Sequence, residues 1–533
     1  MEVECIPFKK TGYFSNLICD YLDAKESLSP FYERPPQIDQ FAEQIRAKQN
    51  FPSSHREVLF SVLKNQYREI DISEDTKVNI SLLREASTYT VVTGHQLNLF
   101  TGPLYFLYKI ISTINLTKEL KLANPENNFV PIYWMATEDH DFDEINYFNF
   151  RGKKLQWNKN ASGAVGPLAT DGLESILEAF SNEMGNSINA SKLKEWFRKA
   201  YLEHDNLTDA TRFLANELFG EHGLVILDGN DAALKRFLVP FVKRDLLENA
   251  SYNKVSETIE QLQLLPENYG IQVNPREINY FYLLDGVRER IVGQDGRFYV
   301  NDTKIEFSQE EILKELENYP ERFSPNVIAR PLYQEVILPN LCYIGGGGEL
   351  AYWLQLKAMF TEMKVPFPIL LLRNSALVIT GKQMEKLKRM NISLADIFLN
   401  QSSFINKKIR EISNIDIDFT PQKKYLQEQF RELYDLAAQT DASFVGAVKA
   451  QEVKQLKGLD NLQGRLLKAQ KRKLQDHVVR MTEIQNQLFP NKSLQERNLN
   501  FSELYLEYGE RLIPHLMKAL RPLSGEFSIV KMD

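Results

Sequence analysis

Cysteine is scarce in this chain, with three residues among 533. Cys5, Cys19 and Cys342 are odd in number and have no paired spacing, so the sequence predicts neither a disulfide framework nor a cysteine-rich metal site. Long apolar runs are also missing, since no stretch approaches the roughly 20 apolar residues that a membrane helix needs. No apolar segment follows the first charged residues, so we expect no leader peptide. These absences favour a cytoplasmic protein with no membrane partner.

The chain also lacks an excess of positive charge. Its 64 Lys and Arg residues are set against 71 Asp and Glu residues, which gives a net charge of −7. Neutralising nucleic-acid phosphates requires a basic surface, so we expect no nucleic-acid partner. One segment departs from this pattern, because residues 449–480 carry nine Lys or Arg residues and three acids. A solvated helix face and a polyanion-binding arm both explain it.

The length exceeds what one hydrophobic core can serve, so two or three domains are expected. Short apolar runs predict the strands of a buried parallel sheet at residues 89–93, 129–136, 223–228, 338–344 and 367–372. A helical pattern separates the first two runs, and this order implies a right-handed parallel crossover. Residues 279–284 and 297–300 predict a small antiparallel excursion. The polar and then helical stretch 146–215 predicts an inserted subdomain.

Residues 385–503 have a helical and charged texture. Leu467, Leu474, Met481 and Leu488 repeat every seven residues, which is typical of a helical hairpin or coiled coil. Polar residues at the companion positions suggest that register or partner orientation is specified, although an exposed single helix tolerates them too.

The first candidate site is the turn Thr93, Gly94, His95 and Gln96, between a strand and a helix that we expect Thr101 to cap. Backbone N–H groups and the helix dipole favour an anion there, such as a phosphate or a carboxylate. An ordinary turn that needs a glycine is the alternative.

The second candidate follows the next strand, where Glu138, Asp139, His140 and Asp141 are consecutive. Carboxylates this dense shift one another's pKa values and suit amine binding, metal binding or proton transfer. His140 between two aspartates fits a metal ligand or a general base. A solvated loop that caps a helix is the alternative.

The third candidate is the glycine run Gly345, Gly346, Gly347 and Gly348 with Glu349, after another predicted strand. Four consecutive glycines increase the entropic cost of ordering the backbone. Such a run favours close contact between the main chain and a flat ligand, such as a nucleotide or amino acid. A flexible linker is the alternative. Ligands of open α/β sheets sit outside the carboxyl ends of the strands, where this interpretation puts all three segments.

With these segments in place, the chain resembles the BshC family, the cysteine-adding enzymes of bacillithiol biosynthesis. The stretches that carry the resemblance are TGHQLNLFTGPLYFLYKIISTINL, PIYWMATEDHDFDEIN, FSPNVIARPLYQEVILPNLCYIGGGGELAYWLQLKAMF and LQERNLNF. The resemblance implies a Rossmann-like α/β core akin to class I aminoacyl-tRNA synthetases, a connective insertion, and a coiled coil that forms a homodimer. The domains expected are core halves at 1–145 and 216–384, the insertion at 146–215, the coiled coil at 385–503, and a segment at 504–533 that packs back on the core.

The resemblance also implies a reaction, in which the carboxyl of cysteine is joined to the amine of glucosaminyl-malate. A carboxylate acylates poorly, so ATP or another nucleotide is expected to activate it; no metal is expected. Two other functions stay open. One is an ATP-dependent enzyme that activates another amino acid, and the other is a dimeric, synthetase-like scaffold that binds RNA through residues 449–480.

Under this resemblance the candidate residues take roles. Gln96, Asp139, His140 and Asp141 are expected to orient the reacting groups or accept the proton of the attacking amine. His95 is assigned to binding, because the family pattern has Gln at its position. Residues expected to bind substrate are Thr93, Gly94, His95, Asn98, Glu138, Gly345, Gly346, Gly348 and Glu349. Arg330 and Arg373 are candidates for the malate carboxylates, with surface ion pairs as the alternative. Gln495, Arg497 and Asn498 match a nucleotide site.

Overall fold

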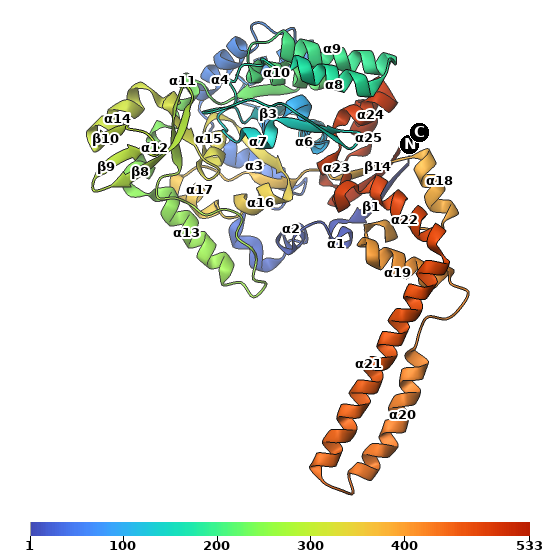
Figure 1. The fold of residues 1–533 in the computed structure, drawn as a ribbon. Coiled ribbons are helices and arrows are strands. Elements are labelled where there is room, and N and C mark those ends of the chain that lie inside the picture. Colours follow the sequence, from blue (N-terminus) through green and yellow to red (C-terminus); the bar gives the residue numbers. More distant parts are fainter. Residues whose placement is uncertain (1, 533) are drawn as a thin grey trace. The chain divides into compact units, whose positions relative to one another are not determined.

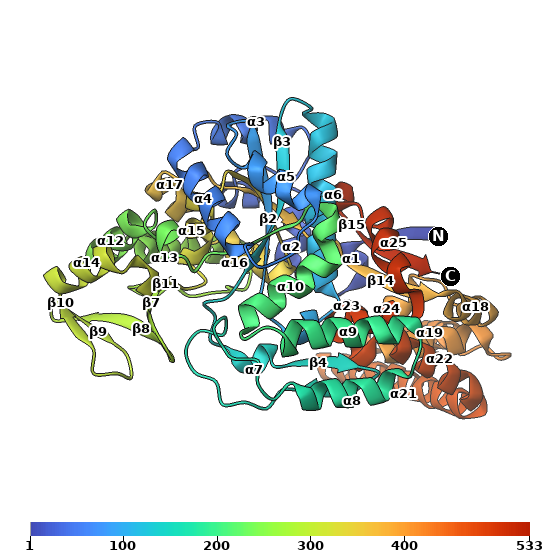
Figure 2. The same cartoon turned by 90° about the horizontal axis from the view of Figure 1, so that it is seen from above.

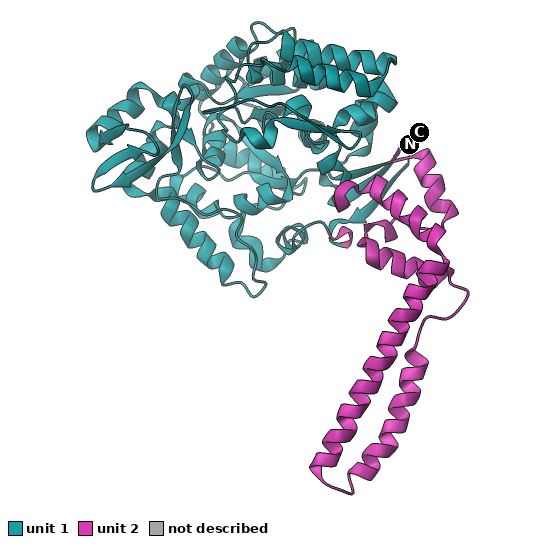
Figure 3. Ribbon diagram, in the orientation of Figure 1, with its two compact units in different colours: residues 1–9, 13–378, 494–530 teal, residues 10–12, 379–493, 531–533 magenta. Residues whose placement is uncertain are grey.

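The computed structural model describes residues 2–532, which form two compact units (Figure 3). Of the described residues, the larger unit contains 2–9, 13–378 and 494–530, and the smaller unit contains 10–12, 379–493 and 531–532. The chain therefore returns to the larger unit after residue 493. No helix in the described part of the chain is long and apolar enough to cross a lipid bilayer.

A five-stranded parallel sheet lies at the centre of the larger unit (Figures 1 and 2). In their order across the sheet, its strands are β13 (Ile369–Leu372), β12 (Asn340–Gly345), β2 (Thr88–His95), β3 (Asn128–Met135) and β6 (Val225–Asp228). Nearly all residues of these strands are buried. Strands covered on both faces read as apolar runs, which is why the sequence predicted them. The predicted α/β core is confirmed.

Helices cover both faces of this sheet. On one face, Leu116 of α6 (Tyr105–Ala123) and Phe41 of α3 (Gln40–Lys48) join the cluster around Val91. Trp134 points to the opposite face, where Tyr333 of α15 (Ala329–Ile337) packs against its ring. In chain order, successive strands are added on one side of β2 and then on the other. The loops that leave β2 and β12 therefore diverge and open a crevice between them.

The predicted cap of α6 is wrong. The helix begins at Tyr105, and Thr101 lies in a preceding turn with a positive φ of 68°. Phe100, also at positive φ, packs in this turn against the rings of Phe148 and Phe501. Burial of this aromatic side chain decides the local backbone, which a capping pattern does not reveal.

The predicted antiparallel excursion is confirmed as a second sheet of five strands. It also contains three strands that the sequence did not predict, β8, β10 and β11. Across the sheet the order is β10 (Glu306–Ser308), β9 (Arg297–Val300), β8 (Val287–Gln294), β7 (Tyr280–Leu284) and β11 (Phe323–Pro325).

Between β3 and β6 the chain forms a hairpin and a group of helices, of which α8 and α9 lie side by side in Figures 1 and 2. These elements are α7 (Phe142–Ile145), β4 (Tyr147–Phe150), β5 (Lys153–Gln156), α8 (Glu174–Met184), α9 (Ile188–Leu202) and α10 (Leu207–Phe219). They occupy the interval in which an insertion was expected, and the exact boundaries of the five predicted domains stay predictions.

The remaining elements of the larger unit surround these sheets. The strands β1 (Glu2–Pro7), β15 (Glu526–Met532) and β14 (Ala376–Thr380) form a third sheet in that order. The helices are α1 (Phe8–Thr11), α2 (Asn16–Leu22), α4 (Ser53–Gln66), α5 (Glu74–Leu82), α11 (Ala232–Lys235), α12 (Val239–Glu248), α13 (Ala250–Gln263), α14 (Gln309–Asn318), α16 (Gly347–Trp353), α17 (Lys357–Met363), α23 (Gln495–Asn498), α24 (Phe501–Tyr508) and α25 (Leu512–Ala519).

The smaller unit is helical and includes a long hairpin of α20 and α21. Its helices are α18 (Gly381–Arg389), α19 (Gln401–Ile412), α20 (Thr420–Ala437), α21 (Ala442–Lys473) and α22 (Gln475–Leu488). Phe430, Ala437 and Val448 form the buried core of the hairpin. The predicted heptad lies elsewhere: Leu474 separates α21 from α22, and Met481 and Leu488 are buried on α22. The heptad residues therefore lie at the end of α21, at the junction and on α22, and they do not form the contact between α20 and α21.

Candidate active site

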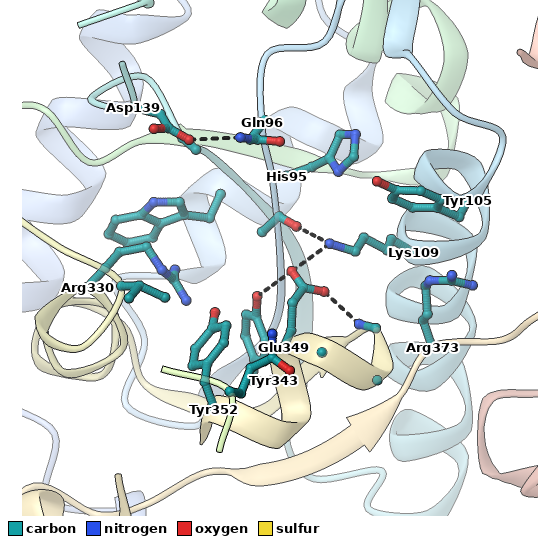
Figure 4. A pocket seen from close by; sticks show the side chains of 18 of the residues that line it. His95, Gln96, Tyr105, Lys109, Asp139, Arg330, Tyr343, Glu349, Tyr352 and Arg373 are labelled. Carbon is teal, nitrogen blue, oxygen red and sulfur yellow. Dashed lines mark hydrogen bonds and ion pairs between the residues drawn. The ribbon is translucent and has the colours of Figure 1, made fainter. Parts of the chain in front are cut away.

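A cavity of about 740 Å³ opens at the carboxyl ends of β2, β3 and β12, where the crevice of the sheet was expected (Figure 4). It is lined by predicted residues from all three candidate segments, by Arg330 and Arg373, and by Arg497 from the C-terminal part of the chain. The predicted residues that line it are Gly94, His95, Gln96, Asp139, Arg330, Gly346, Gly348, Glu349, Arg373 and Arg497. Glu144, which belongs to the acidic cluster of the second candidate segment, also lines it. Lining residues that the sequence did not single out include Tyr105, Lys109, Trp134 and Tyr343.

The end of β2 forms the rear of the cavity. A Cβ atom on Gly94 would lie 3.3 Å from the Tyr343 hydroxyl and 3.8 Å from Arg330 Nη1, so the glycine lets both side chains reach the strand end. Thr93 does not line the cavity. Its hydroxyl donates to Ile344 O at 2.7 Å and so ties β2 to β12. The structure thus places the Thr93 hydroxyl within the sheet, and its predicted role at a ligand stays a prediction.

His95 is 7% exposed, and its Nε2 has no hydrogen-bond partner in the described part of the chain. Burial and the nearby Lys109 charge lower the pKa of His95 well below its usual value of 6.5. The imidazole is therefore neutral near pH 7. A neutral, buried ring fits the binding role assigned to it better than proton transfer.

This pKa predicts a dependence of stability on pH. The folded state resists protonation of His95 and the unfolded state accepts it near pH 6.5, so stability present above that pH falls as the solution is acidified. We expect the wild type to lose up to about 1.4 kcal/mol per pH unit more than His95→Gln below pH 6.5. Urea unfolding of both proteins at pH 7.5 and 5.5 measures this, and equal losses would contradict it.

Lys109 is the most informative residue that the sequence reasoning missed. Its Nζ is buried and donates to Gly94 O at 2.7 Å and to Glu349 Oε1 at 2.8 Å. Burial lowers the pKa of Lys109 from its usual value, and the Glu349 charge opposes that shift. Lys109 therefore joins the first candidate turn to the glycine run. A single lysine inside the apolar helix sequence YFLYKIISTINL was the signal that could have found it.

The glycine run is a strand end followed by a helix start. Gly345 ends β12, and a Cβ atom there would lie 2.9 Å from both Leu350 and Tyr343, so close packing explains this glycine. The helix α16 begins at Gly347. Glu349 turns back to accept a hydrogen bond from Gly346 N at 2.6 Å. The run therefore contributes to the cavity wall through Gly346, Gly347 and Gly348.

The acidic segment divides between two environments. Asp139 faces the cavity, where its Oδ2 accepts a hydrogen bond from Gln96 Nε2 at 2.9 Å. The same amide nitrogen donates to Glu144 Oε2 at 2.9 Å, so one amide bridges two carboxylates. Gln96 and Asp139 are thus brought together as the sequence predicted, with Glu144 as a third member.

The neighbours of Asp139 turn elsewhere. Glu138 forms an ion pair with the buried Lys235. His140 Nδ1 lies 2.6 Å from Arg288 Nη1. Neither residue lines the cavity, and neither does the exposed Asp141. These contacts hold the acidic segment in place, and the catalytic roles of His140 and Asp141 stay predictions.

Arg330 and Arg373 provide positive charge on opposite sides of the cavity (Figure 4). Arg373 is 4% exposed and pairs with Glu496 at 2.7 Å, yet its buried Nε has no hydrogen-bond partner within residues 2–532. Nη2 of Arg330, which lies near Tyr352, likewise meets no partner in good hydrogen-bond geometry in that range. Buried donors that lack partners are costly, so both groups are suited to an anionic ligand.

The other predicted residues lie around the cavity. Asn98 donates to Glu144 O at 3.2 Å and lines a smaller neighbouring chamber. Gln495 is buried, and its amide pairs with the backbone of Val378 through Oε1 at 2.9 Å and Nε2 at 3.0 Å. Asn498 Nδ2 donates to Leu494 O. Of the residues matched to a nucleotide site, only Arg497 reaches the cavity.

Comparison with known proteins places this cavity in a family. The model of the BshC N-terminal Rossmann-like domain of bacillithiol biosynthesis matches residues 1–374, and the model of the BshC C-terminal coiled-coil domain matches residues 376–532. The chain belongs to the BshC family. The cavity described above lies in the BshC Rossmann-like domain, except for Arg497, which comes from the segment matched to the C-terminal domain.

BshC relatives match over their full lengths. A protein of Christiangramia forsetii is 58% identical and one of Flavobacterium johnsoniae is 57% identical, with 99% of this chain covered in both cases and 99% and 100% of the relatives. A protein of Bacillus thuringiensis is 26% identical over the whole of both chains. Each bears the name "Putative cysteine ligase BshC".

A solved structure from Campylobacter jejuni, with the name "putative arginyl t-RNA synthetase", is also similar to the chain. It is 9% identical, with a TM-score of 0.21, and the match covers 84% of this chain and 98% of that one. The likeness to class I synthetases stays a prediction.

Proposed function

We propose that this chain is a ligase that joins the carboxyl group of cysteine to the amine of glucosaminyl-malate and so forms bacillithiol. The observation that carries the proposal is the full-length match to BshC relatives. The cavity supports it chemically, because it combines arginines for a dicarboxylate with carboxylates that suit an amine. Both groups are needed to bind an amino sugar that carries malate.

In this proposal the cavity residues divide the work. Arg330 and Arg373 bind the malate carboxylates through their unpaired donors. Gln96 orients Asp139, and Asp139 accepts the proton that the amine loses. The amine nitrogen forms a bond to the cysteine carboxyl carbon, while the bond from that carbon to the activated oxygen breaks and its electron pair leaves with the oxygen.

We also propose that a nucleotide, ATP or another, is required. When bound, it supplies the group that activates the cysteine carboxyl. Arg497 fits an interaction with its phosphates, because its side chain faces the cavity. Gln495 does not fit, since both ends of its buried amide are used by the backbone of Val378. A thiol substrate is kept reduced in the cytoplasm, which we propose as the location.

The direct test is an assay of the purified protein with glucosaminyl-malate, ATP and each amino acid in turn, with products identified by mass. We expect a conjugate with cysteine alone. A conjugate with a different amino acid would assign another activating enzyme. If no conjugate forms and RNA binds with submicromolar, steeply salt-dependent affinity, the scaffold alternative replaces the ligase.

We further propose that the α20–α21 hairpin mediates a homodimer. Several large apolar side chains on it are exposed in the single chain, including Tyr425, Leu436 and Val453 at 68%, 59% and 58%. Exposed apolar side chains along a helical hairpin favour a protein partner, and a second copy of the hairpin offers matching ones.

Leu436→Asp combined with Val453→Asp is expected to weaken the dimer at least about 100-fold, or roughly 2.7 kcal/mol, because charges would be buried in the interface. Analytical ultracentrifugation measures this. Leu122→Asp is the control, since Leu122 lies on α6 in the larger unit and is 85% exposed. An unchanged dimer in the double variant would place the interface elsewhere.

A further inference from the structure

A smaller chamber of about 300 Å³ adjoins the main cavity. The two spaces share four lining residues, Gln96, Tyr105, Glu144 and Arg497, which therefore form the boundary between them. The rest of the smaller chamber includes Asn98, Tyr147 and Asn149. Two connected spaces of unequal size are suited to two substrates of unequal size.

The charges of the two spaces differ in a way that separates the substrates. Besides the shared Glu144 and Arg497, the main cavity contains Lys109, Asp139 and Glu349. It also contains Arg330 and Arg373, which match the two carboxylates of malate and are absent from the smaller chamber. The smaller chamber contains one guanidinium, Arg497, and one carboxylate, Glu144. One charge of each sign matches the zwitterion of a free amino acid.

Both charged groups of the smaller chamber are available to a ligand. The Arg497 guanidinium has no hydrogen bond or ion pair with any residue from 2 to 532, and the residue is exposed. Glu144 receives one side-chain hydrogen bond, from Gln96 Nε2 to its Oε2. Asn98 is 7% exposed, and its buried Oδ1 has no partner in the described chain. A polar ligand would meet groups that the fold leaves unsatisfied.

Aromatic side chains give the chamber a surface for a thiol. Tyr105 is half-buried at the boundary, and burial raises the pKa of its hydroxyl, so it stays neutral. Tyr147 begins β4 and is half-buried, with Lys154 Nζ 4.0 Å from its ring centroid. A polarisable sulfur packs favourably against aromatic rings.

We propose that this smaller chamber is the cysteine subsite, with the α-ammonium at Glu144, the carboxylate at Arg497 and the thiol against Tyr147. This inference rests on the proposed ligase function and names the position of one of its substrates. Gln96 donates hydrogen bonds to both Glu144 and Asp139, and Figure 4 shows the bond to Asp139. A cysteine carboxyl at the boundary would therefore lie near Asp139, the proposed base for the attacking amine. The subsite also explains how a thiol is selected without a metal.

The test compares KM values for cysteine, glucosaminyl-malate and ATP in Glu144→Gln and Arg497→Met. Glutamine at position 144 keeps an oxygen that accepts from Gln96, so the Asp139 side of the bridge is preserved. We expect KM for cysteine to rise at least about tenfold in both variants and KM for glucosaminyl-malate to change less than about twofold. KM for ATP is expected to stay within about twofold in Glu144→Gln and to rise in Arg497→Met, because Arg497 is also proposed to contact the nucleotide phosphates. Asp143→Asn, one residue away and outside both spaces, is the charge-matched control.

A third variant tests the thiol contact. Tyr147→Leu is expected to lower the preference for cysteine over serine at least about threefold while activity with cysteine persists. A rise in KM for glucosaminyl-malate or ATP without a rise for cysteine would overturn the subsite, and so would unchanged KM values.

If the ligase proposal itself fails, the wild-type protein will form no cysteine conjugate, and this result distinguishes that failure from failure of the subsite. Calorimetric titration of wild type and Glu144→Gln with L-cysteine tests the subsite in that case. Binding to the wild type that weakens at least about tenfold in the variant supports the subsite, and equal or absent binding overturns it.

Discussion

Lys109→Met is expected to lower the free energy of unfolding by about 3 kcal/mol and to reduce conjugate formation at least about 100-fold. Removing one partner of a buried ion pair leaves the other charge uncompensated, which costs about 3–5 kcal/mol. The lower end applies because Glu349 is 28% exposed. Activity falls because the Gly94 carbonyl and Glu349 lose the group that fixes them, and a 1 Å misplacement can cost about 100-fold in rate.

Urea unfolding and the conjugate assay measure the two effects of Lys109→Met. Lys25→Met is the matched control, because Lys25 also pairs with carboxylates but is 38% exposed, and we expect a change of at most about 1 kcal/mol. The double variant Lys109→Met with Glu349→Gln should be less destabilised than the two single variants sum to. Additive losses with normal turnover would show that the pair does not couple the two segments.

Asp139→Asn is expected to lower kcat about 100-fold, because a positioned general base contributes about 10²–10⁴-fold. The substitution preserves the shape of the side chain and an oxygen that can accept from Gln96, so KM for cysteine should change little. Asp143→Asn removes the same charge four residues later, outside the cavity, and should keep near-normal turnover. A kcat within about threefold of wild type for Asp139→Asn would assign proton transfer to another group.

The parallel sheet could be predicted because each of its strands is buried on both faces and so reads as an apolar run. The convergence of Gln96, Asp139 and Glu349 on one cavity could be predicted for the same reason, since the three segments follow parallel strands and the carboxyl ends of such strands meet at one edge. The topology of the sheet was therefore sufficient to predict which segments meet at the site.

The direction of individual side chains could not be predicted. Glu138 and Asp139 are adjacent in sequence, yet one pairs with Lys235 and the other faces the cavity, and only the tertiary position of Lys235 decides this. Thr93 and Gln495 have residue types that suit ligand binding, but backbone groups from distant strands occupy them. The lone lysine in an apolar helix pattern indicated a buried charge at position 109, but its partners Gly94 and Glu349 could not be predicted.

The return of the chain after residue 493 has a consequence for how the protein matures. Arg373 directly follows β13 and forms an ion pair with Glu496, which the ribosome adds more than a hundred residues later. Until that segment emerges, the nascent Rossmann-like domain contains a guanidinium without its counterion and a cavity without Arg497. Chains that stop inside the helical hairpin would therefore be inactive and would contain an unpaired internal charge. The resulting loss of stability would let quality-control proteases degrade them in preference to the full-length enzyme.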